Sequence, residues 1–175
     1  MNYWVIGIGG AVIVGLVGFI WRTYNDLIIK RINVERQESH VEVHLKKKFD
    51  MIPAIIDVVK GYAGHEKGTL EEVTRLRSQW GKITNSEEKV KTSNLLEAAL
   101  SKLLIVQERY PQLKANRNFM DLQRSIGYVE RELVHERKVY NKRVSWYNST
   151  LQLFPKNLVA KMFNFQEKSF FSMKE

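Results

Sequence analysis

The first residues of the chain form an uninterrupted apolar stretch, YWVIGIGGAVIVGLVGFIW, in which no residue is charged. At about 1.5 Å per residue, a helix of this length matches the hydrocarbon core of a bilayer. Aromatic side chains stand at both ends of it, as they do at the two surfaces of a membrane, and Arg22 follows it. The pattern predicts a transmembrane anchor over residues 1–22, with five interface residues: Tyr3, Trp4, Trp21, Arg22 and Tyr24.

Two features predict that this anchor is retained and how it is oriented. No Lys or Arg precedes it, and the residues after Trp21 do not form the small-residue site at which signal peptides are cleaved. Basic residues begin directly after the span with Arg22, Lys30 and Arg31. The excess of positive charge on the cytoplasmic side of such helices predicts an external N-terminus and a cytoplasmic remainder.

Small residues recur every four positions within the span, at Gly7, Ala11 and Gly15, with Gly18 nearby. Such a face allows two membrane helices to approach closely, which favours self-association. Glycine is also common in membrane helices without any such role, so both interpretations remain open here.

The remainder of the chain has the apolar spacing of long helices. Leu27, Val34 and Val41 are seven residues apart, and the spacing resumes at Leu45 after a step of four. We therefore expect one long helix to about Ile83 with a kink or a short break at Pro53. The competing interpretation is that Asp50 caps a new helix with Pro53 in its first turn.

Two further helical stretches follow. One begins at a predicted cap, Asn85, and ends near Pro111, and the next begins at Asn116 and ends before Pro155. The last stretch carries the clearest apolar stripe: Phe119, Leu122, Ile126, Val129, Leu133, Tyr140, Val144, Tyr147 and Leu151. Together these elements predict an all-α fold, in which the anchor continues into a long antiparallel helical bundle of residues 23–153.

Two groups of residues interrupt the helical pattern. Gly61, Gly64 and Gly68 predict either close packing of another helix, which we favour, or a deliberately weak helix. Glu136 and Arg143 fall at positions of the last stripe where apolar residues are expected. They are either partnered residues at the bundle margin, the blander interpretation, or a buried polar site.

Residues 154–175 differ from the body because they combine phenylalanines with interleaved lysines. We expect a short helix near Lys156 and three alternatives for the tail: it closes the bundle, inserts into the membrane interface, or docks on another copy. The candidate docking residues are Phe154, Phe163, Phe165, Phe170 and Phe171.

Charge and candidate chemistry narrow the function. The net charge of +9 fits an anionic membrane surface or nucleic acid, and the anchor favours lipid because no nucleic-acid-binding motif is visible. The absence of cysteine excludes disulfides and thiol chemistry. His40 and His44 share a helix face, but the sequence HVEVH lacks the Glu placement of zincins. We expect no metal, cofactor, small-molecule substrate or catalytic activity.

Three blocks of the sequence resemble the bacterial LemA family. These are KKKFDMIPAIIDVVKGYAGHEKGTLEEV, RYPQLKANRNFMDLQ and YNKRVSWYNSTLQLFPKNLVAKMFNF, the last of which holds two Tyr-Asn pairs. Tyr24-Asn25-x-Leu27 is similar to the family's start. Ala54 stands where the family tends to have Asn, Asn164 stands where it often has Gly, and residues 34–44 match poorly.

The resemblance implies a bacterial inner- or plasma-membrane protein with a cytoplasmic helical domain and no established catalytic activity. Two functions are compatible with it. The first is an anchored scaffold that self-associates through the span, the bundle or the tail. The second is a monomeric adaptor that presents a helical face to another membrane protein such as a protease, with Trp80, Trp146 and Arg137 as exposed anchors.

Overall fold

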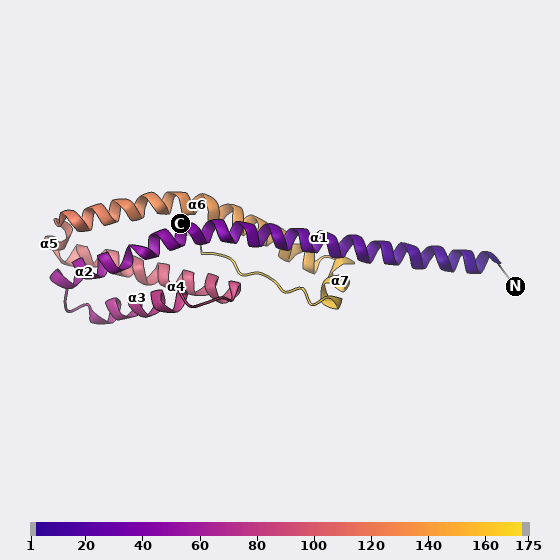
Figure 1. Ribbon diagram of the computed structural model, residues 1–175, viewed down its shortest axis with the longest axis horizontal. Coiled ribbons are helices and arrows are strands. Elements are labelled where there is room, and N and C mark those ends of the chain that lie inside the picture. The colour runs from indigo at the N-terminus through magenta and orange to yellow at the C-terminus, as the bar shows by residue number, and fades with distance from the viewer. Residues whose placement is uncertain (1–2, 173–175) are drawn as a thin grey trace. The chain divides into compact units, whose positions relative to one another are not determined.

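The computed structural model describes residues 3–172, apart from the side chains of Val5 and Ile6. This part of the chain is helical and contains no strand, which confirms the predicted all-α fold (Figure 1). The helices are α1 (Tyr3–Asp50), α2 (Ile52–Tyr62), α3 (Lys67–Trp80), α4 (Ser86–Ile105), the 3-10 helix η1 (Val106–Arg109), α5 (Pro111–Lys114), α6 (Arg117–Gln152) and α7 (Lys156–Met162).

Contacts divide the chain into two compact units. Unit 1 comprises residues 1–36 and 142–168, and unit 2 comprises residues 37–141 and 169–175. The division falls inside α1, inside α6 and inside the C-terminal tail. The predicted body of residues 23–153 and the predicted tail of residues 154–175 therefore each contribute to both units.

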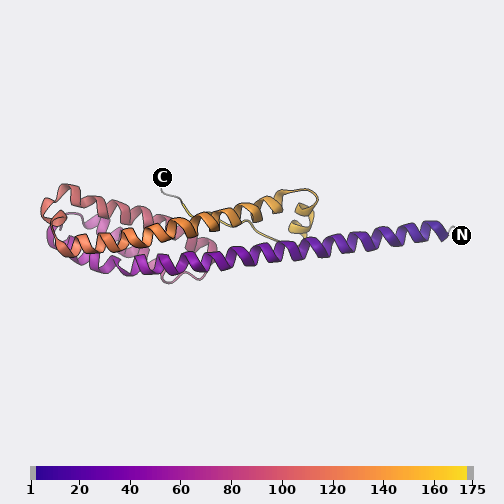
Figure 2. The same cartoon turned by 90° about the horizontal axis from the view of Figure 1, so that it is seen from above.

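Unit 2 is an antiparallel helical bundle. The second part of α1, α2, α3, α4 and the first part of α6 lie side by side, and α3 runs back along α2 (Figures 1 and 2). Of the apolar positions that the repeat predicted, Val41, Leu45, Phe119, Ile126, Val129, Leu133 and Tyr140 line its core, and they are buried together with Ile52, Ile56, Val59, Ala63, Leu70, Val73, Leu96, Ala99 and Leu103. The repeat therefore identified the core-facing residues correctly.

The helix is interrupted near Pro53, as one of the two expectations allowed, but its expected continuation to Ile83 is wrong. The chain breaks at Met51, and α2 begins with Pro53 in its first turn, where a missing N–H is tolerated. Asp50 does not cap α2, since no side chain caps that helix. A turn over residues 63–66 then reverses the chain into α3. The same apolar seam continues across these breaks because successive short helices face one core.

Two predicted helix starts are confirmed. The side chain of Asn85 accepts a hydrogen bond from the Glu88 N–H at 3.0 Å, at the start of α4. Asn116 accepts one from the Phe119 N–H at 3.0 Å, at the start of α6. Each cap satisfies a backbone donor that a helix leaves unpaired at its first turn.

Unit 1 contains the first part of α1, the end of α6, and α7. The chain leaves α7 through Asn164, which adopts a left-handed conformation with φ 53°. The Phe165 N–H then donates to the Ala160 carbonyl at 2.9 Å, which completes a Schellman turn. Asparagine tolerates this conformation better than other non-glycine residues, so Asn164 can stand where the family often has glycine.

Candidate functional site

The core of unit 2 holds a cluster of charged side chains. Lys48 on α1 donates to Glu97 on α4 at 2.6 Å and also contacts Glu130 on α6. Arg137 on α6 lies 3.6 Å from Glu97 and 3.7 Å from Glu130. Lys48, Glu97 and Arg137 are each at most 3% exposed. Two cations and two carboxylates therefore neutralise one another inside a bundle whose core is mostly apolar.

Sequence reasoning missed this charge cluster. Lys48 continues the seven-residue spacing of Leu27, Val34 and Val41, but it stands in a run of three lysines that suggests a solvated surface. Glu130 and Arg137 are themselves seven residues apart on α6. Charged residues that share the period of the core are the signal that could have identified them.

The two polar candidates that the sequence did single out are half-buried, and each has a partner. The Gln37 amide donates to the Glu136 carboxylate at 2.5 Å. The Arg143 guanidinium donates to the Asn33 carbonyl at 2.8 Å. Both pairs join α6 to α1 at the margin of the packed helices, and Glu136 directly precedes the fully buried Arg137.

The Tyr-Asn pair at the end of α6 holds the tail in unit 1. The Tyr147 hydroxyl donates to the Gln166 carbonyl at 3.0 Å. The Asn148 amide donates to the Lys168 carbonyl at 2.9 Å and accepts from the Lys168 N–H at 3.0 Å. The Asn side chain thus pairs with a backbone as a neighbouring strand would.

The Tyr-Asn pair seven residues earlier makes the same contacts in unit 2. The Tyr140 hydroxyl donates to the Ser169 carbonyl at 3.0 Å. Asn141 donates to the Phe171 carbonyl at 2.8 Å and accepts from its N–H at 3.0 Å. On α4, Asn94 accepts from the Ser172 N–H at 2.9 Å. The sequence indicated the two Tyr-Asn pairs only as part of the resemblance and did not predict that they bind the tail.

Both tyrosines are more weakly acidic than usual. Burial raises the pKa of Tyr140, and the charge of Glu38 raises it further. Burial also raises the pKa of Tyr147, with Glu35 adding to the effect and Arg31 opposing it. The neutral hydroxyls are therefore favoured, as hydrogen-bond donors to the tail must be.

The tail phenylalanines occupy different environments. The rings of Phe163 and Phe165 pack at an angle against Tyr24 in unit 1, with ring centroids 4.7 and 5.8 Å away. Phe171 is buried in unit 2 against Tyr140, with centroids 4.8 Å apart. Phe154 is 80% exposed and Phe170 is 49% exposed. The tail therefore packs partly on its own chain and leaves some aromatic surface open.

Within the described residues, one helix is long and apolar enough to cross a membrane, and it lies near the N-terminus. Only 11% of its most apolar window is buried. A Cβ built at Gly7, Gly15 or Gly18 meets no atom within 4 Å, so the small-residue face is open. The predicted interface residues Tyr3, Trp4, Trp21, Arg22 and Tyr24 are exposed, with Tyr24 partly covered by the tail.

An ion-pair group joins α7 to α1 in unit 1. Asp26 accepts from Lys156 at 2.9 Å and from Lys30 at 3.0 Å. Burial raises the pKa of Asp26, but the hydrogen bonds and charges of the two lysines outweigh it and leave the pKa below its usual value. Lys30 also donates to Thr150 on α6 at 3.0 Å. Asp26 therefore fixes α7 beside the first turns after the apolar stretch.

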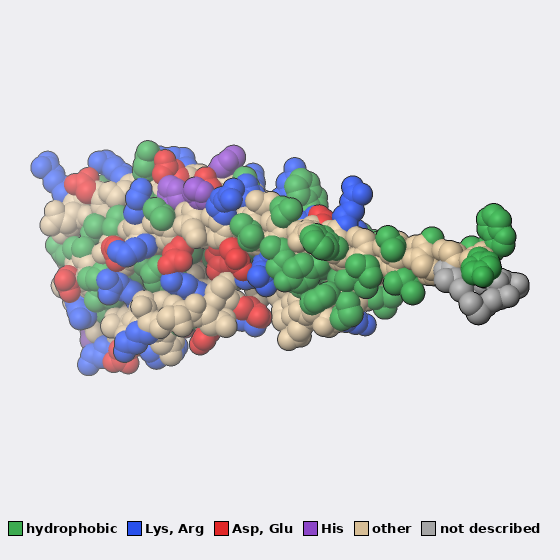
Figure 3. All heavy atoms as spheres, turned by 45° about the vertical axis from the view of Figure 1, so that its right-hand side comes forward, with side chains coloured by type: hydrophobic (Ala, Val, Ile, Leu, Met, Phe, Trp, Pro, Cys, Tyr) green, Lys and Arg blue, Asp and Glu red, His purple; other side chains and the backbone are tan. Residues whose placement is uncertain are grey.

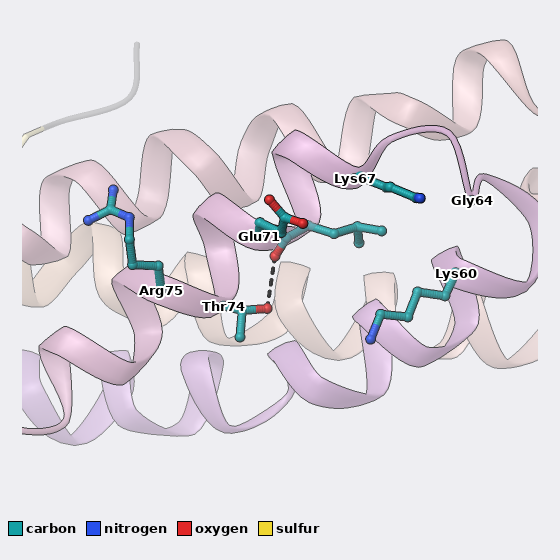
Figure 4. A pocket seen from close by; sticks show the side chains of 7 residues that line it. Lys60, Gly64, Lys67, Glu71, Thr74 and Arg75 are labelled. Carbon is teal, nitrogen blue, oxygen red and sulfur yellow. Dashed lines mark hydrogen bonds between the residues drawn. The ribbon is translucent and has the colours of Figure 1, made fainter.

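The glycines at the α2–α3 reversal do not pack against another helix. A Cβ at Gly61 or Gly68 meets nothing within 4 Å, and at Gly64 it meets only the Lys60 carbonyl at 3.7 Å. The predicted close helix contact is therefore not found in this part of the described chain. Gly64 instead borders an open groove of about 660 Å³, lined by Lys60, Lys67, Leu70, Glu71, Thr74 and Arg75 (Figure 4).

Two other sequence expectations can be located. His40 is exposed and His44 lies 3.3 Å from Glu132, and no group of three potential metal ligands occurs among the described residues. Of the expected surface anchors, Trp80 and Arg137 are buried, and only Trp146 is exposed. The Trp80 indole donates to the Ser93 hydroxyl at 2.8 Å. Trp80 and Arg137 were therefore wrong as exposed anchors.

Comparisons with known proteins agree with the sequence blocks. The model of the LemA family matches residues 37–175, which begin at the first residue of unit 2. The chain is also similar to Protein LemA of Metamycoplasma hominis, with 23% identity over 152 residues that cover 86% of this chain and 69% of that relative. Because the family model matches most of the chain, this protein belongs to the LemA family.

Proposed function

We propose that this protein is a non-enzymatic scaffold, anchored in the bacterial cell membrane by the first part of α1, that self-associates at the cytoplasmic face. The observation that carries the proposal is the exposed apolar surface of α1. Ile8, Ile13, Val14 and Leu16 are each more than half exposed. A surface of this extent is unusual on a free soluble chain and suits lipid.

The orientation in this proposal rests on charge. Unit 1 carries nine Lys and Arg against three Asp and Glu, and all of these follow the apolar stretch. Basic residues beside a span are retained in the cytoplasm and are attracted to anionic lipid. The N-terminus would thus lie outside and the bundle inside.

Self-association is proposed through the face of Gly7, Ala11 and Gly15. These residues are four apart, so they lie on one side of the helix, and no atom of the described chain fills the space beside the two glycines. Two copies could bring their backbones together there, where close packing replaces contacts with lipid.

The test is the mass of the full-length protein in native lipid patches, measured by mass photometry. Gly15→Leu should shift a defined oligomer to smaller species. Gly9→Leu is the matched control, because Gly9 lies about 200° around the helix from Gly7 and is equally open. Both replacements have room in the single chain, so a selective effect of Gly15→Leu reports on assembly. A wild-type monomer would contradict self-association.

The alternative function, an adaptor for another membrane protein such as a protease, is favoured by one residue. Trp146 is 60% exposed on α6, with the Lys142 ammonium 4.9 Å from its ring centroid. Exposed tryptophans are common anchors of protein interfaces. Photo-crosslinking from position 146 in cells would recover a foreign membrane protein for an adaptor and only other copies of this chain for a scaffold.

A further inference from the structure

The segment around α7 presents an apolar surface on unit 1 that no described residue covers. Leu153, Phe154, Leu158 and Met162 are each at least 58% exposed. They follow one another closely in the chain, on α7 and on the turn that precedes it. Figure 3 shows hydrophobic side chains gathered on the surface of unit 1, beside the first part of α1.

Contacts within unit 1 fix the level of this surface along α1. Lys156 binds Asp26 at 2.9 Å, and the ring of Phe163 packs against Tyr24. Positions 24–26 lie three to five residues beyond Trp21, the last residue of the apolar stretch, which corresponds to about 5–8 Å of helix. This is the depth of the headgroup region when the stretch spans the hydrocarbon core.

Shape and charge favour lipid as the partner that covers the apolar surface around α7. An open hollow of about 500 Å³ lies between α1 and Phe163, the residue that follows α7, and is lined by Val17, Ile20, Trp21, Tyr24, Asn25 and Phe163. The lipid-facing side of α1 thus continues onto the tail. Basic residues surround the same region, namely Arg22, Lys30, Arg31, Lys156 and Lys161. Apolar side chains beside lysines and arginines are the composition of segments that lie in an anionic membrane interface.

We propose that Leu153, Phe154, Leu158 and Met162 insert into the cytoplasmic interface of the membrane, so that α7 is a second, surface-bound attachment beside the span. This inference rests on the anchor in the proposed function. Its consequence is mechanical: a single helix can tilt and rotate freely, whereas two attachments at one level restrain unit 1 against the bilayer.

The absence of native cysteine permits single labels in the full-length chain. Three variants are compared: Leu158→Cys on α7, Val14→Cys in the apolar stretch, and Leu95→Cys on α4 of unit 2. Leu95 is the matched control for Leu158, because the two side chains are 59% and 58% exposed. Each carries an environment-sensitive fluorophore in vesicles of equal parts phosphatidylcholine and phosphatidylglycerol, to which a lipid quencher is added at headgroup depth or at the bilayer centre.

The proposal predicts that the Leu158 label is blue-shifted and is quenched severalfold more than the Leu95 label by the headgroup-depth quencher. The Val14 label should respond to the quencher at the bilayer centre. If Val14 responds and Leu158 does not, the interfacial attachment is overturned while the anchor stands. If Val14 does not respond, both fail.

Two other outcomes distinguish the alternative occupants. A Leu158 label that is blue-shifted without lipid quenching is covered by protein, such as a second copy, and overturns the proposal. Equal quenching of Leu95 and Leu158 shows that lipid contact is not specific to α7, which also overturns it. Replacing phosphatidylglycerol by phosphatidylcholine should weaken the Leu158 response if the lysines and arginines contribute.

Discussion

The two units treat charge and apolar surface in opposite ways. Unit 2 buries Lys48, Glu97 and Arg137, and it covers most of its large hydrophobic side chains. Unit 1 keeps its ion pairs near the surface and leaves most of its large apolar residues exposed. Its nine basic residues face three acidic ones, whereas unit 2 has nineteen against sixteen.

The difference lies in where each kind of side chain finds its partner. The buried charges of unit 2 are neutralised within its own core, so they are unsuited to recognising a partner. The exposed apolar residues of unit 1 are not covered by the chain itself. Function should therefore be sensitive to the surface of unit 1, and folding should be sensitive to the interior of unit 2.

The largest effect is expected from Glu97→Ala. This change leaves Lys48 and Arg137 buried with Glu130 as their remaining carboxylate. Removing one member of a buried ion pair costs about 3–5 kcal/mol, because the other charge stays desolvated. Urea unfolding of the full-length protein in nanodiscs, followed by circular dichroism, should show this loss in the free energy of unfolding.

An exposed ion pair in the same unit provides the control. Asp121 lies 3.2 Å from Arg124, and both are at least 70% exposed, so Asp121→Asn should change the unfolding free energy by less than about 1 kcal/mol. The double variant Lys48→Met with Glu97→Leu keeps the Arg137–Glu130 pair and should recover part of the loss. Equal effects of Glu97→Ala and Asp121→Asn would contradict the contrast between core and surface.

The sequence predicted the apolar half of this core better than its charged half. The period of the apolar residues on α6 located its core-facing positions, and of that stripe only Leu122 is half-buried. The stripe of α6 can, however, be followed through Glu136 and Arg143 or through Glu130 and Arg137. Arg137 is the one of these four that is fully buried, and the partners that stabilise it, Lys48 and Glu97, come from distant parts of the sequence.

The second prediction compares the two Tyr-Asn pairs. Asn148→Ala removes two hydrogen bonds to the backbone of Lys168, at about 1 kcal/mol each. Asn141→Ala removes the equivalent pair from Phe171, whose ring stays buried. Hydrogen exchange by mass spectrometry should therefore show a larger loss of protection in residues 166–168 for Asn148→Ala than in residues 169–171 for Asn141→Ala.

A conservative change tests whether the hydrogen bonds of Asn148 hold the tail. Asn148→Asp keeps an acceptor for the Lys168 N–H but cannot donate to its carbonyl, so it should give an intermediate loss of protection. If Asn148→Ala leaves the exchange of the tail unchanged, its hydrogen bonds do not hold the tail.

The two Tyr-Asn pairs bind the tail in the same way for a simple geometric reason that sequence analysis could have used. Seven helical residues rise about 10.5 Å, and three extended residues span at most about 10 Å. Tyr-Asn pairs seven apart can therefore bind tail residues three apart, as Asn148 and Asn141 bind Lys168 and Phe171. What the sequence could not predict was which segment they bind, because side-chain amides pair equally well with any free backbone.

The third prediction concerns alkaline pH. The pKa of Tyr140 and of Tyr147 is raised in the folded chain by burial, so both favour the neutral form. Their contribution to stability is complete below the unfolded pKa of about 10 and is lost as the pH rises above it. Each should lower the unfolding free energy by up to about 1.4 kcal/mol per pH unit in that range.

Chemical denaturation at a series of pH values tests this effect. The double variant Tyr140→Phe with Tyr147→Phe lacks both ionisable hydroxyls, so its stability should fall less steeply above pH 10 than that of the wild type, although it starts lower. Parallel slopes would show that neither tyrosine is responsible.

The smallest effect is expected at two matched aspartates of α1. Asp26 in unit 1 binds Lys30 four residues away and Lys156 on α7, and Asp50 in unit 2 binds Lys46 four residues away and Arg77 on α3. Asp26 is 35% exposed and Asp50 is 55% exposed, so Asp26→Asn and Asp50→Asn should each cost about 1 kcal/mol or less. The two variants should differ in which helix loses protection from hydrogen exchange.

Asp26 holds a short helix to α1, and Asp50 joins longer helices that have a buried core. Asp26→Asn should therefore increase hydrogen exchange in residues 156–163, and Asp50→Asn should leave α3 protected. The depressed pKa of Asp26 means that its stabilisation is complete above the unfolded value and is lost as the pH falls through the lower folded value. The α7 amides of the wild type should lose protection on acidification toward that range, whereas those of Asp26→Asn should show the reduced protection at neutral pH already. Equal protection of α7 in both proteins would show that Phe163 and Tyr24, rather than the ion pairs, hold this segment to α1.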